Sequence, residues 1–359
     1  MSASRLYDTW FQWVTKSLPD ERLTRRRNLT WFIVGLHLSQ SVHLARIGAK
    51  LPLQVPLCSV TARLSRFLQN RAFQVRRWYR PIAEALLRQA AAQGVVRLIV
   101  DSSKVSAHHQ LLIVCLAYRK RALPIVWTWV SGARGHSSAM TQEALLRYVY
   151  HLLPPGAEVL LVGDCEFGAV AVMQQMQAWG WHYVLRQRGN LLACVHAQSR
   201  WQHLEQLLPY KGKVFWYPQA LLTAQLWHGG LLCYWRNGEK EPWFLATNLS
   251  GPAAVLHAYR LRMGIEQMYG DWKGHGVRLE QTHLCHISRL ARLTFVVALS
   301  YLWLVTEGSQ TIKKGLRHWV DRKDRRDLSI YRIGLYVIER CCACALPFSV
   351  RLIPYFYKL

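Results

Sequence analysis

The chain has 359 residues, 51% of them hydrophobic, which suffices to bury a sizeable core in one large or two to three smaller domains and excludes wholesale disorder. Its 46 Lys and Arg residues against 20 Asp and Glu give a formal net charge of +26. Repulsion among these cations destabilises a compact chain unless a polyanion binds or the charges lie far apart. Nucleic acid is therefore the expected partner, and no amphipathic Lys-rich helix or lipidation signal favours a membrane surface instead.

Residues 1–90 are expected to form a helical N-terminal region that contacts DNA. Apolar residues recur at helical spacing over 31–44 and 60–68, and Pro52 and Pro56 break the segment between them. Basic side chains precede the first of these helices and decorate the second half of the region: Arg22, Arg25, Arg26, Arg27, Arg63, Arg66, Arg71, Arg76, Arg77 and Arg80. Basic helices are also typical of ordinary solvated faces, and that alternative stays open.

From residue 91 the pattern changes to a mixed sheet with helices on its faces. Strands are expected at 95–100, 111–118, 125–130, 159–162 and 183–186, and helices at 141–153 and 169–179. Because strands come first and then alternate with helices, the fold class is α/β. Asp101 is expected to end the first of these strands, and Asp164 the fourth.

A β insertion is expected at 190–250, between the second of these acids and the helix that follows. Short aromatic strands at 214–217, 231–235 and 243–247 are separated by turn signals at Gly229-Gly230 and Asn237-Gly238. The α/β pattern resumes at 251–310 with a long helix that starts near Ala253. A basic helical C-terminal region is expected at 311–359.

The nine cysteines indicate the reducing environment of the cytoplasm, and the expected nucleic-acid partner indicates association with the nucleoid. The cysteines show no regular spacing, and buried free thiols are expected at the cluster of Cys341, Cys342 and Cys344 rather than a zinc site. Leu293 to Thr306 is shorter than the roughly 20 residues that a bilayer requires, so it predicts a buried helix.

The chemistry of the chain is expected at three acids and one predicted helix face. Tyr259, Arg262, Glu266 and Lys273 lie at i, i+3, i+7 and i+14, which puts one acid among two cations and a phenol on one face. With Asp101 and Asp164, Glu266 completes an acid set that fits two-metal phosphoryl transfer, since Mg²⁺ takes hard oxygen ligands.

Each of these assignments has an alternative. An Asp after a strand is commonly a helix N-cap or a turn residue. Glu166 competes with Asp164 as the ligand, and Asp271 and Glu280 compete with Glu266. The two cations on the helix face also suit ordinary ion pairing to Glu266.

The helix-face residues resemble the Y-R-E-K signature of DDE insertion-sequence transposases, the cut-and-paste group that moves DNA through hairpin ends. The four residues that match this signature are Tyr259, Arg262, Glu266 and Lys273. Four further segments are similar to motifs of that family: 99–103 around the first acid, 162–168 around the second, 186–190, and 325–330. One position departs from the family pattern, because Cys165 stands where an Arg commonly follows the second acid.

The resemblance implies a ribonuclease-H-like core interrupted by a β insertion, with Mg²⁺ or Mn²⁺ as the cofactor. It also implies a homodimer that binds double-stranded DNA, both the terminal inverted repeats of the transposon and the target. Carried over residue by residue, it makes the metal ligands Asp101, Asp164 and Glu266, the phosphate contacts Tyr259, Arg262 and Lys273, and the residue that stacks on a flipped base Trp243.

The implied reaction is attack by water, hairpin formation by the released 3′-OH, reopening, and strand transfer into the target. Two rival functions use the same features. One is a ribonuclease-H-like nuclease that cuts DNA without transposition, and the other is a non-catalytic basic DNA-binding relative.

Overall fold

The structure, a computed structural model, forms two compact units. Their boundaries fall within helix α5 (Val75–Ala91), at both ends of the segment Val105–His109, and within helix α9 (Met263–Trp272). The first unit comprises Met1–Leu86, Val105–His109 and Tyr269–Leu359, and the second Leu87–Lys104 and Gln110–Met268. The described residues are 2–105, 108–132, 137–195, 200–208, 210–223, 225–274 and 276–356.

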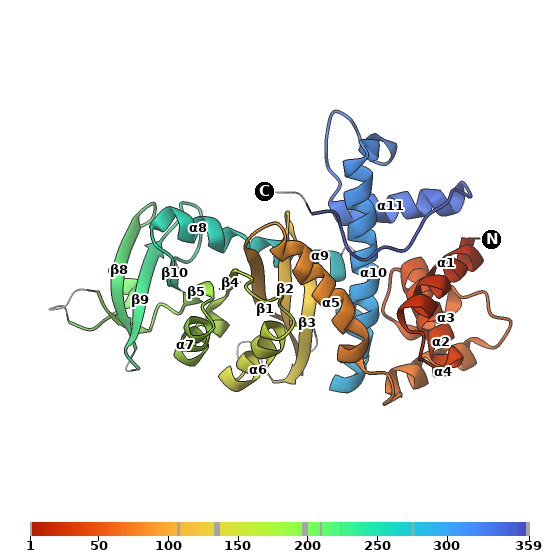
Figure 1. Ribbon diagram of the computed structural model, residues 1–359, viewed down its shortest axis with the longest axis horizontal. Helices are drawn as coiled ribbons and strands as arrows, with labels where there is room; N and C mark the ends of the chain where they lie inside the picture. The colour runs from red at the N-terminus through yellow and green to blue at the C-terminus, as the bar shows by residue number, and fades with distance from the viewer. Residues whose placement is uncertain are drawn as a thin grey trace. The chain divides into compact units, whose positions relative to one another are not determined.

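The first unit is helical and is built around the long helix α10, Ile287–Lys313 (Figure 1). Its other elements are α1 Ser2–Ser17, α2 Leu23–Ser39, α3 Leu44–Ala49, α4 Leu57–Gln69, most of α5 Val75–Ala91, the 3₁₀ helices η3 Leu279–Gln281 and η4 Leu316–Trp319, and α11 Ile330–Ala343. Helices α2, α4 and α11 contact α10. The helical N-terminal region predicted from the sequence is therefore confirmed.

Helix α10 contains the predicted buried stretch, and every residue from Leu293 to Val305 is buried. By length and composition it is also the one helix of the described residues that could cross a membrane. However, 83% of its most apolar window is buried inside the structure, as in the core helix of a water-soluble fold.

Two glycines let α10 and α11 approach each other closely. A Cβ on Gly308 would lie 1.9 Å from the carbonyl oxygen of Ile330, and one on Gly334 would lie 1.8 Å from that of Leu304. Neither backbone oxygen can yield as a flexible side chain would, so only glycine permits this crossing. All nine cysteines are free thiols, and within the 341–344 cluster only Cys341 is buried, so the prediction of buried thiols is wrong for Cys344, which is exposed.

The second unit is a ten-stranded mixed sheet in the order β3-β2-β1-β4-β5-β10-β9-β8-β6-β7. The strands are β1 Val96–Lys104, β2 His109–Tyr118, β3 Arg121–Ser131, β4 Val159–Gly163, β5 His182–Gln187, β6 Leu192–Cys194, β7 Gln202–His203, β8 Val214–Leu222, β9 Trp227–Tyr234 and β10 Trp243–Thr247. Strand β1 is antiparallel to β2 and parallel to β4, β4 is parallel to β5, and β10 is antiparallel to β5.

Helices flank this sheet, which confirms the predicted α/β class with a mixed sheet. Helix α6, Ala139–Tyr150, contacts β3, and α7, Val170–Ala178, contacts α6 and β5. Helix α8, Pro252–Arg260, contacts β4 and β5. The 3₁₀ helices η1 Cys165–Phe167 and η2 Leu204–Leu207 complete the unit.

Two turn and strand predictions are wrong for identifiable reasons. Strand β1 does not end at Asp101: its parallel pairing with β4 stops at Val100, but its antiparallel pairing with β2 continues to Lys104. The Gly229-Gly230 pair lies inside β9 rather than at a turn, because a Cβ on either glycine would overlap the ring of Trp227 or Trp216. These glycines make room for tryptophans on the sheet, whereas Asn237-Gly238 does form a turn.

Candidate active site

Asp101 lies in β1, immediately beyond the last residue that pairs with β4. It is 6% exposed, and its Oδ1 accepts a hydrogen bond of 2.9 Å from the backbone N–H of Ser102. Burial raises the pKa of the Asp101 carboxyl from 3.8 to about 7, the Arg262 guanidinium and the Ser102 N–H oppose that rise, and the charges of Asp164 and Glu266 add to it. The site therefore holds this acid where its charge is costly unless a cation is present.

Asp164 directly follows β4, at the level of Asp101 on the neighbouring strand β1. The last parallel pair of β1 and β4 is Val100 with Gly163, so the two acids follow at the same level on strands about 4.8 Å apart. The Asp164 Oδ1 accepts a hydrogen bond of 2.8 Å from the N–H of Cys165 and caps η1. The N-cap alternative is thus correct locally, and it leaves the second carboxylate oxygen for another role.

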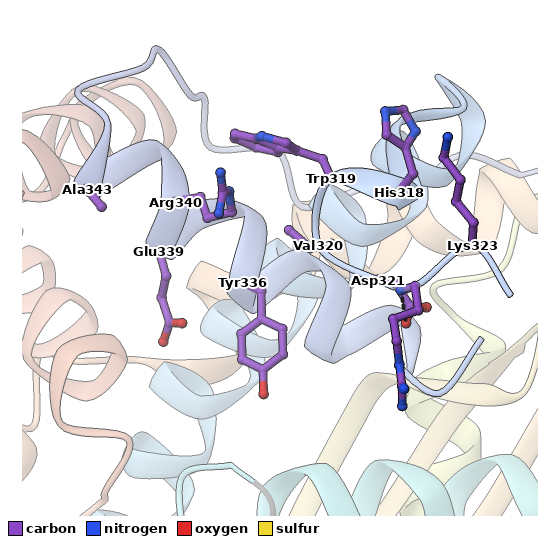
Figure 2. Close-up of a pocket in the computed structure, with 10 residues that line it drawn as sticks. His318, Trp319, Val320, Asp321, Lys323, Tyr336, Glu339, Arg340 and Ala343 are labelled. Atoms are coloured by element: carbon purple, nitrogen blue, oxygen red, sulfur yellow. Dashed lines mark hydrogen bonds between the residues drawn. The ribbon is translucent and has the colours of Figure 1, made fainter. Parts of the chain in front are cut away.

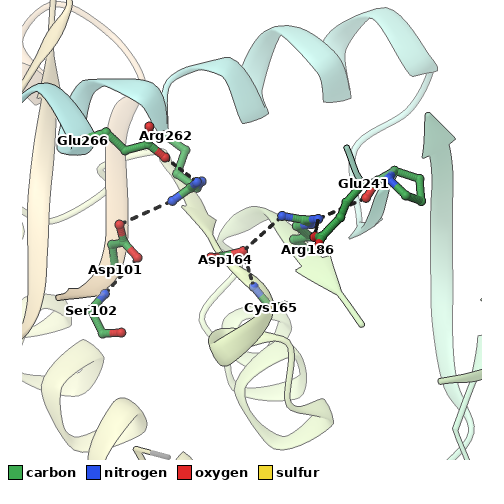
Figure 3. A network of polar contacts seen from close by, with 9 residues as sticks. Asp101, Ser102, Asp164, Cys165, Arg186, Glu241, Arg262 and Glu266 are labelled. Carbon is green, nitrogen blue, oxygen red and sulfur yellow. Dashed lines mark hydrogen bonds and ion pairs between the residues drawn. The ribbon is translucent and has the colours of Figure 1, made fainter. Parts of the chain in front are cut away.

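Arg186, on β5, supplies the positive charge beside Asp164. Its Nη1 lies 3.9 Å from the Asp164 Oδ1, and its Nη2 lies 3.0 Å from Oε2 of Glu241 (Figure 3). No role for Arg186 is predicted from the sequence, except that it lies in the segment 186–190 that is similar to a family motif. The signal for it is that β5 runs parallel to β4, so the two strand ends meet at one edge of the sheet.

The prediction of one continuous helix face for Arg262 and Glu266 is wrong, because the helix is broken between α8 and α9. Helix α8 ends at Arg260 and α9 runs from Met263 to Trp272, with Arg262 in the turn between them. Gly264, the second residue of α9, lies close against β3, because its Cβ would lie 2.9 Å from the carbonyl oxygen of Arg121. Close approach to the sheet requires glycine there, and glycine is a weak helix former.

The turn places the Arg262 guanidinium between two of the three predicted acids. Its Nη1 lies 3.4 Å from Oδ2 of Asp101 and its Nη2 lies 2.6 Å from Oε1 of Glu266 (Figure 3). The Arg262 side chain is 15% exposed, and the neighbouring Tyr259, Asp101, Asp164 and Glu266 raise its pKa against the effect of burial. The predicted ion pair of Arg262 with Glu266 therefore exists, and it extends to Asp101.

Tyr259 and Trp243 pack together next to these charges. Their ring centroids are 5.0 Å apart in an edge-on arrangement, and the Trp243 ring also meets the ring of Tyr234 at 5.8 Å. The Tyr259 hydroxyl is buried without a hydrogen-bond partner among the described residues, and burial raises its pKa. A phosphate contact by Tyr259 therefore requires a movement that uncovers the hydroxyl, whereas the half-buried Trp243 is reachable.

Of the competing acids, Glu166 shares the second unit with the three predicted acids and is already engaged. The Glu166 carboxylate accepts hydrogen bonds from Ser102, Gln110 and Ser137, so it anchors these segments instead of facing an open space. Asp271 and Glu280 belong to the first unit, while Asp101, Asp164 and Glu266 belong to the second.

Lys273, the last residue of the predicted signature, also belongs to the first unit and follows the end of α9. Its Nζ lies 5.7 Å from the centroid of the Tyr269 ring. The predicted single face thus breaks into three separate parts: Tyr259 on α8, Glu266 on α9, and Lys273 beyond α9.

The three acids offer the right donor atoms for a divalent cation, but they are not gathered around one. Among the described residues, no three His, Cys, Asp or Glu side chains lie close enough together to hold a metal ion. The reason is visible in Figure 3: guanidinium groups lie beside the carboxylates of Asp101, Glu266 and Asp164. The donor set is hard oxygen, which fits Mg²⁺ or Mn²⁺ once Arg262 is displaced.

The chain is similar to a known protein family and to solved structures. A model of the transposase DDE domain matches residues 94–303, more than half of the chain. Among solved structures, the chain is similar to piggyBac transposase in a cryo-EM synaptic complex with hairpin DNA, with a TM-score of 0.44 and 10% identity over 96% of this chain and 84% of that one. No curated protein matches the chain.

Proposed function

Because the chain belongs to the transposase DDE domain family, we propose that it cuts the ends of a transposon and joins them to target DNA. The observation that carries this proposal is the convergence of Asp101 and Glu266 on one guanidinium, from positions 161 and 4 residues away from Arg262. Asp164 begins beside Asp101 on the neighbouring parallel strand. Asp101 and Asp164 thus follow neighbouring parallel strands, and Glu266 is linked to Asp101 through Arg262.

In this proposal Asp101, Asp164 and Glu266 hold Mg²⁺ or Mn²⁺. The bound ions supply charge neutralisation of the phosphate and activation of the attacking oxygen. The carboxyl group of Asp101 must lose its proton for this role, and its pKa of about 7 puts that loss close to neutral pH. Glu266 stands in the first turn of α9.

The cations and rings around the acids position the DNA. Arg262 has a planar fork that matches two phosphate oxygens, so it is suited to leave the carboxylates for a phosphate near the cut. Tyr259 and Lys273 are further proposed phosphate contacts. Trp243 is the proposed stacking residue for a flipped base, supported by its half-buried indole next to Tyr259.

The proposed substrates are the double-stranded terminal inverted repeats and the target DNA, bound by a homodimer that brings two ends together. The net charge of +26 supports a polyanionic partner. Within the second unit, Arg186 and Arg262 concentrate positive charge beside the acids, where an approaching phosphate needs it.

The test is Mn²⁺-dependent nicking and joining on a plasmid that carries the DNA flanking the gene. Wild type is compared with Glu266→Gln and Asp101→Asn, which keep the shape of each side chain and remove its charge. Glu280→Gln is the matched control, because it changes an exposed acid of the first unit in the same way. Wild type and the control are expected to nick and to join ends, and the two site variants to do neither.

Equal nicking by wild type and Glu266→Gln would remove the acids from the reaction. Nicking that depends on Glu266 but never yields joined ends would instead identify a nuclease without transposition.

A further inference from the structure

A second cationic feature lies in the first unit, in a cleft between η4 and α11. The cleft has a volume of about 650 Å³, and the side chains that line it include His318, Trp319, Asp321, Lys323, Glu339 and Arg340 (Figure 2). None of these residues falls within the 94–303 segment that matches the transposase DDE domain. The cleft therefore needs an explanation separate from that of the three acids.

The two carboxylates in the cleft are already engaged within the protein. Asp321 accepts a hydrogen bond of 2.7 Å from Nε of Arg317 and one of 3.0 Å from the backbone N–H of Arg322, so it shapes the turn after η4. Glu339 accepts a hydrogen bond of 3.1 Å from the amide of Gln40. Neither acid forms an ion pair with Lys323 or Arg340.

Two cations that line the cleft, Lys323 and Arg340, are available for a ligand. Within the part of the chain that the structure describes, Lys323 and Arg340 are in no ion pair. The Arg340 guanidinium lies 5.1 Å from the centroid of the Trp319 ring, next to which Figure 2 shows it. Stacking on an indole holds the guanidinium plane in place and leaves its N–H edges for a ligand.

A further cation that lines the cleft, Arg322, forms only an exposed ion pair. Arg322 pairs with Asp327 at 3.0 Å, but the two side chains are 67% and 41% exposed, and such surface pairs contribute little. Asp327 is also shared with Arg325 at 2.8 Å. Arg322 can therefore exchange this carboxylate for another anion at small cost.

We propose that this cleft binds the phosphate backbone of duplex DNA, independently of base sequence, as a contact separate from the acid site. Unpaired cations on a concave surface focus positive potential, which attracts a polyanion. The Arg340 guanidinium and the Lys323 ammonium both line the cleft and can each contact a phosphate, and neither side chain reads a base by itself. This inference rests on the proposed function only in taking DNA as the partner.

The test measures how DNA affinity depends on salt in the full-length protein. Fluorescence anisotropy of a labelled duplex gives the slope of log K against log salt concentration, for one duplex of transposon-end sequence and one of arbitrary sequence. Each lost phosphate contact on duplex DNA is expected to reduce the magnitude of that slope by about 0.9. Lys323→Gln and Arg340→Gln should each show this reduction, equally on both duplexes.

Two further variants separate the contact from general effects of charge and folding. Arg351→Gln removes an exposed charge of the same unit that lines a different pocket, so its slope should match that of wild type. Arg340→Lys keeps the charge and should keep the slope while binding less tightly than wild type. Unchanged slopes in Lys323→Gln and Arg340→Gln, or losses confined to the end sequence, overturn the proposal.

The outcomes for the two proposals are distinguishable. If wild type nicks and joins ends but Lys323→Gln has the same salt slope as wild type, only the proposal for the cleft is refuted. A wild type whose slope depends on Lys323 but that never cuts DNA refutes the transposase proposal alone.

Discussion

Replacing Asp101 with Asn is expected to stabilise the metal-free protein, and increasingly so as the pH rises. The carboxyl has a pKa of about 7 in the folded chain and 3.8 when unperturbed, so the folded state binds the proton more tightly. For such a raised pKa, the stability contributed by the group is fully present below pH 3.8 and is lost as the pH rises through 7. At about 1.4 kcal/mol for each pH unit, the interval from 3.8 to 7 corresponds to about 4 kcal/mol.

Asn cannot ionise, so Asp101→Asn escapes this loss. The difference in free energy of unfolding between the variant and wild type should therefore grow by about 3 kcal/mol between pH 5 and pH 8. Urea titrations in the presence of a chelator at pH 5, 6, 7 and 8 measure it, and Asp324→Asn at an exposed site serves as the control. Adding Mn²⁺ at pH 8 should stabilise wild type and not Asp101→Asn.

A difference between Asp101→Asn and wild type that stays constant from pH 5 to pH 8 refutes the reasoning. It would mean that the buried carboxyl is not held in a site where its charge is costly. Stabilisation of both proteins by Mn²⁺ to the same extent would separately exclude Asp101 as a ligand.

Three further outcomes follow from the same geometry. Arg262→Ala removes the cation that lies between two carboxylates, so calorimetry should show tighter Mn²⁺ binding without DNA and roughly tenfold weaker DNA binding, and weaker Mn²⁺ binding would contradict this. Gly264→Ala places a methyl group 2.9 Å from the Arg121 carbonyl oxygen and should cost about 1–3 kcal/mol in urea titrations, whereas Gly274→Ala, which meets open space, should not. Trp243→Ala should reduce hairpin formation more than first-strand nicking on denaturing gels, and a uniform loss at both steps would remove the stacking role.

The positions of Asp101 and Asp164 could be predicted from the sequence because they depend on local patterns. Each follows a run of apolar residues that forms a strand, and parallel strands place their following residues at one edge of the sheet. The class of the fold follows from the same periodicity. Distance along the chain does not matter to this argument, since only the direction of the two strands enters it.

The break at Arg262 and the partners of Arg186 could not be predicted in this way. Spacing alone cannot distinguish a continuous helix from two helices, and it does not show that Gly264 lies close against β3. Likewise, the contact of Arg186 with Glu241 joins residues 55 apart and depends on which strand pairs with β5. Both features come from tertiary packing, which overrides local propensity.

The guanidinium groups of Arg262 and Arg186 offset the negative charges of the three predicted acids. Two neighbouring carboxylates repel each other, and burial makes each charge more costly. Arg262 offsets this for Asp101 and Glu266, and Arg186 does so for Asp164. A divalent ion must compete with Arg262 for the same oxygen atoms, while a DNA phosphate competes with those oxygens for Arg262. Each ligand thus removes an obstacle to the other, and we expect DNA and metal to bind more tightly together than either does alone.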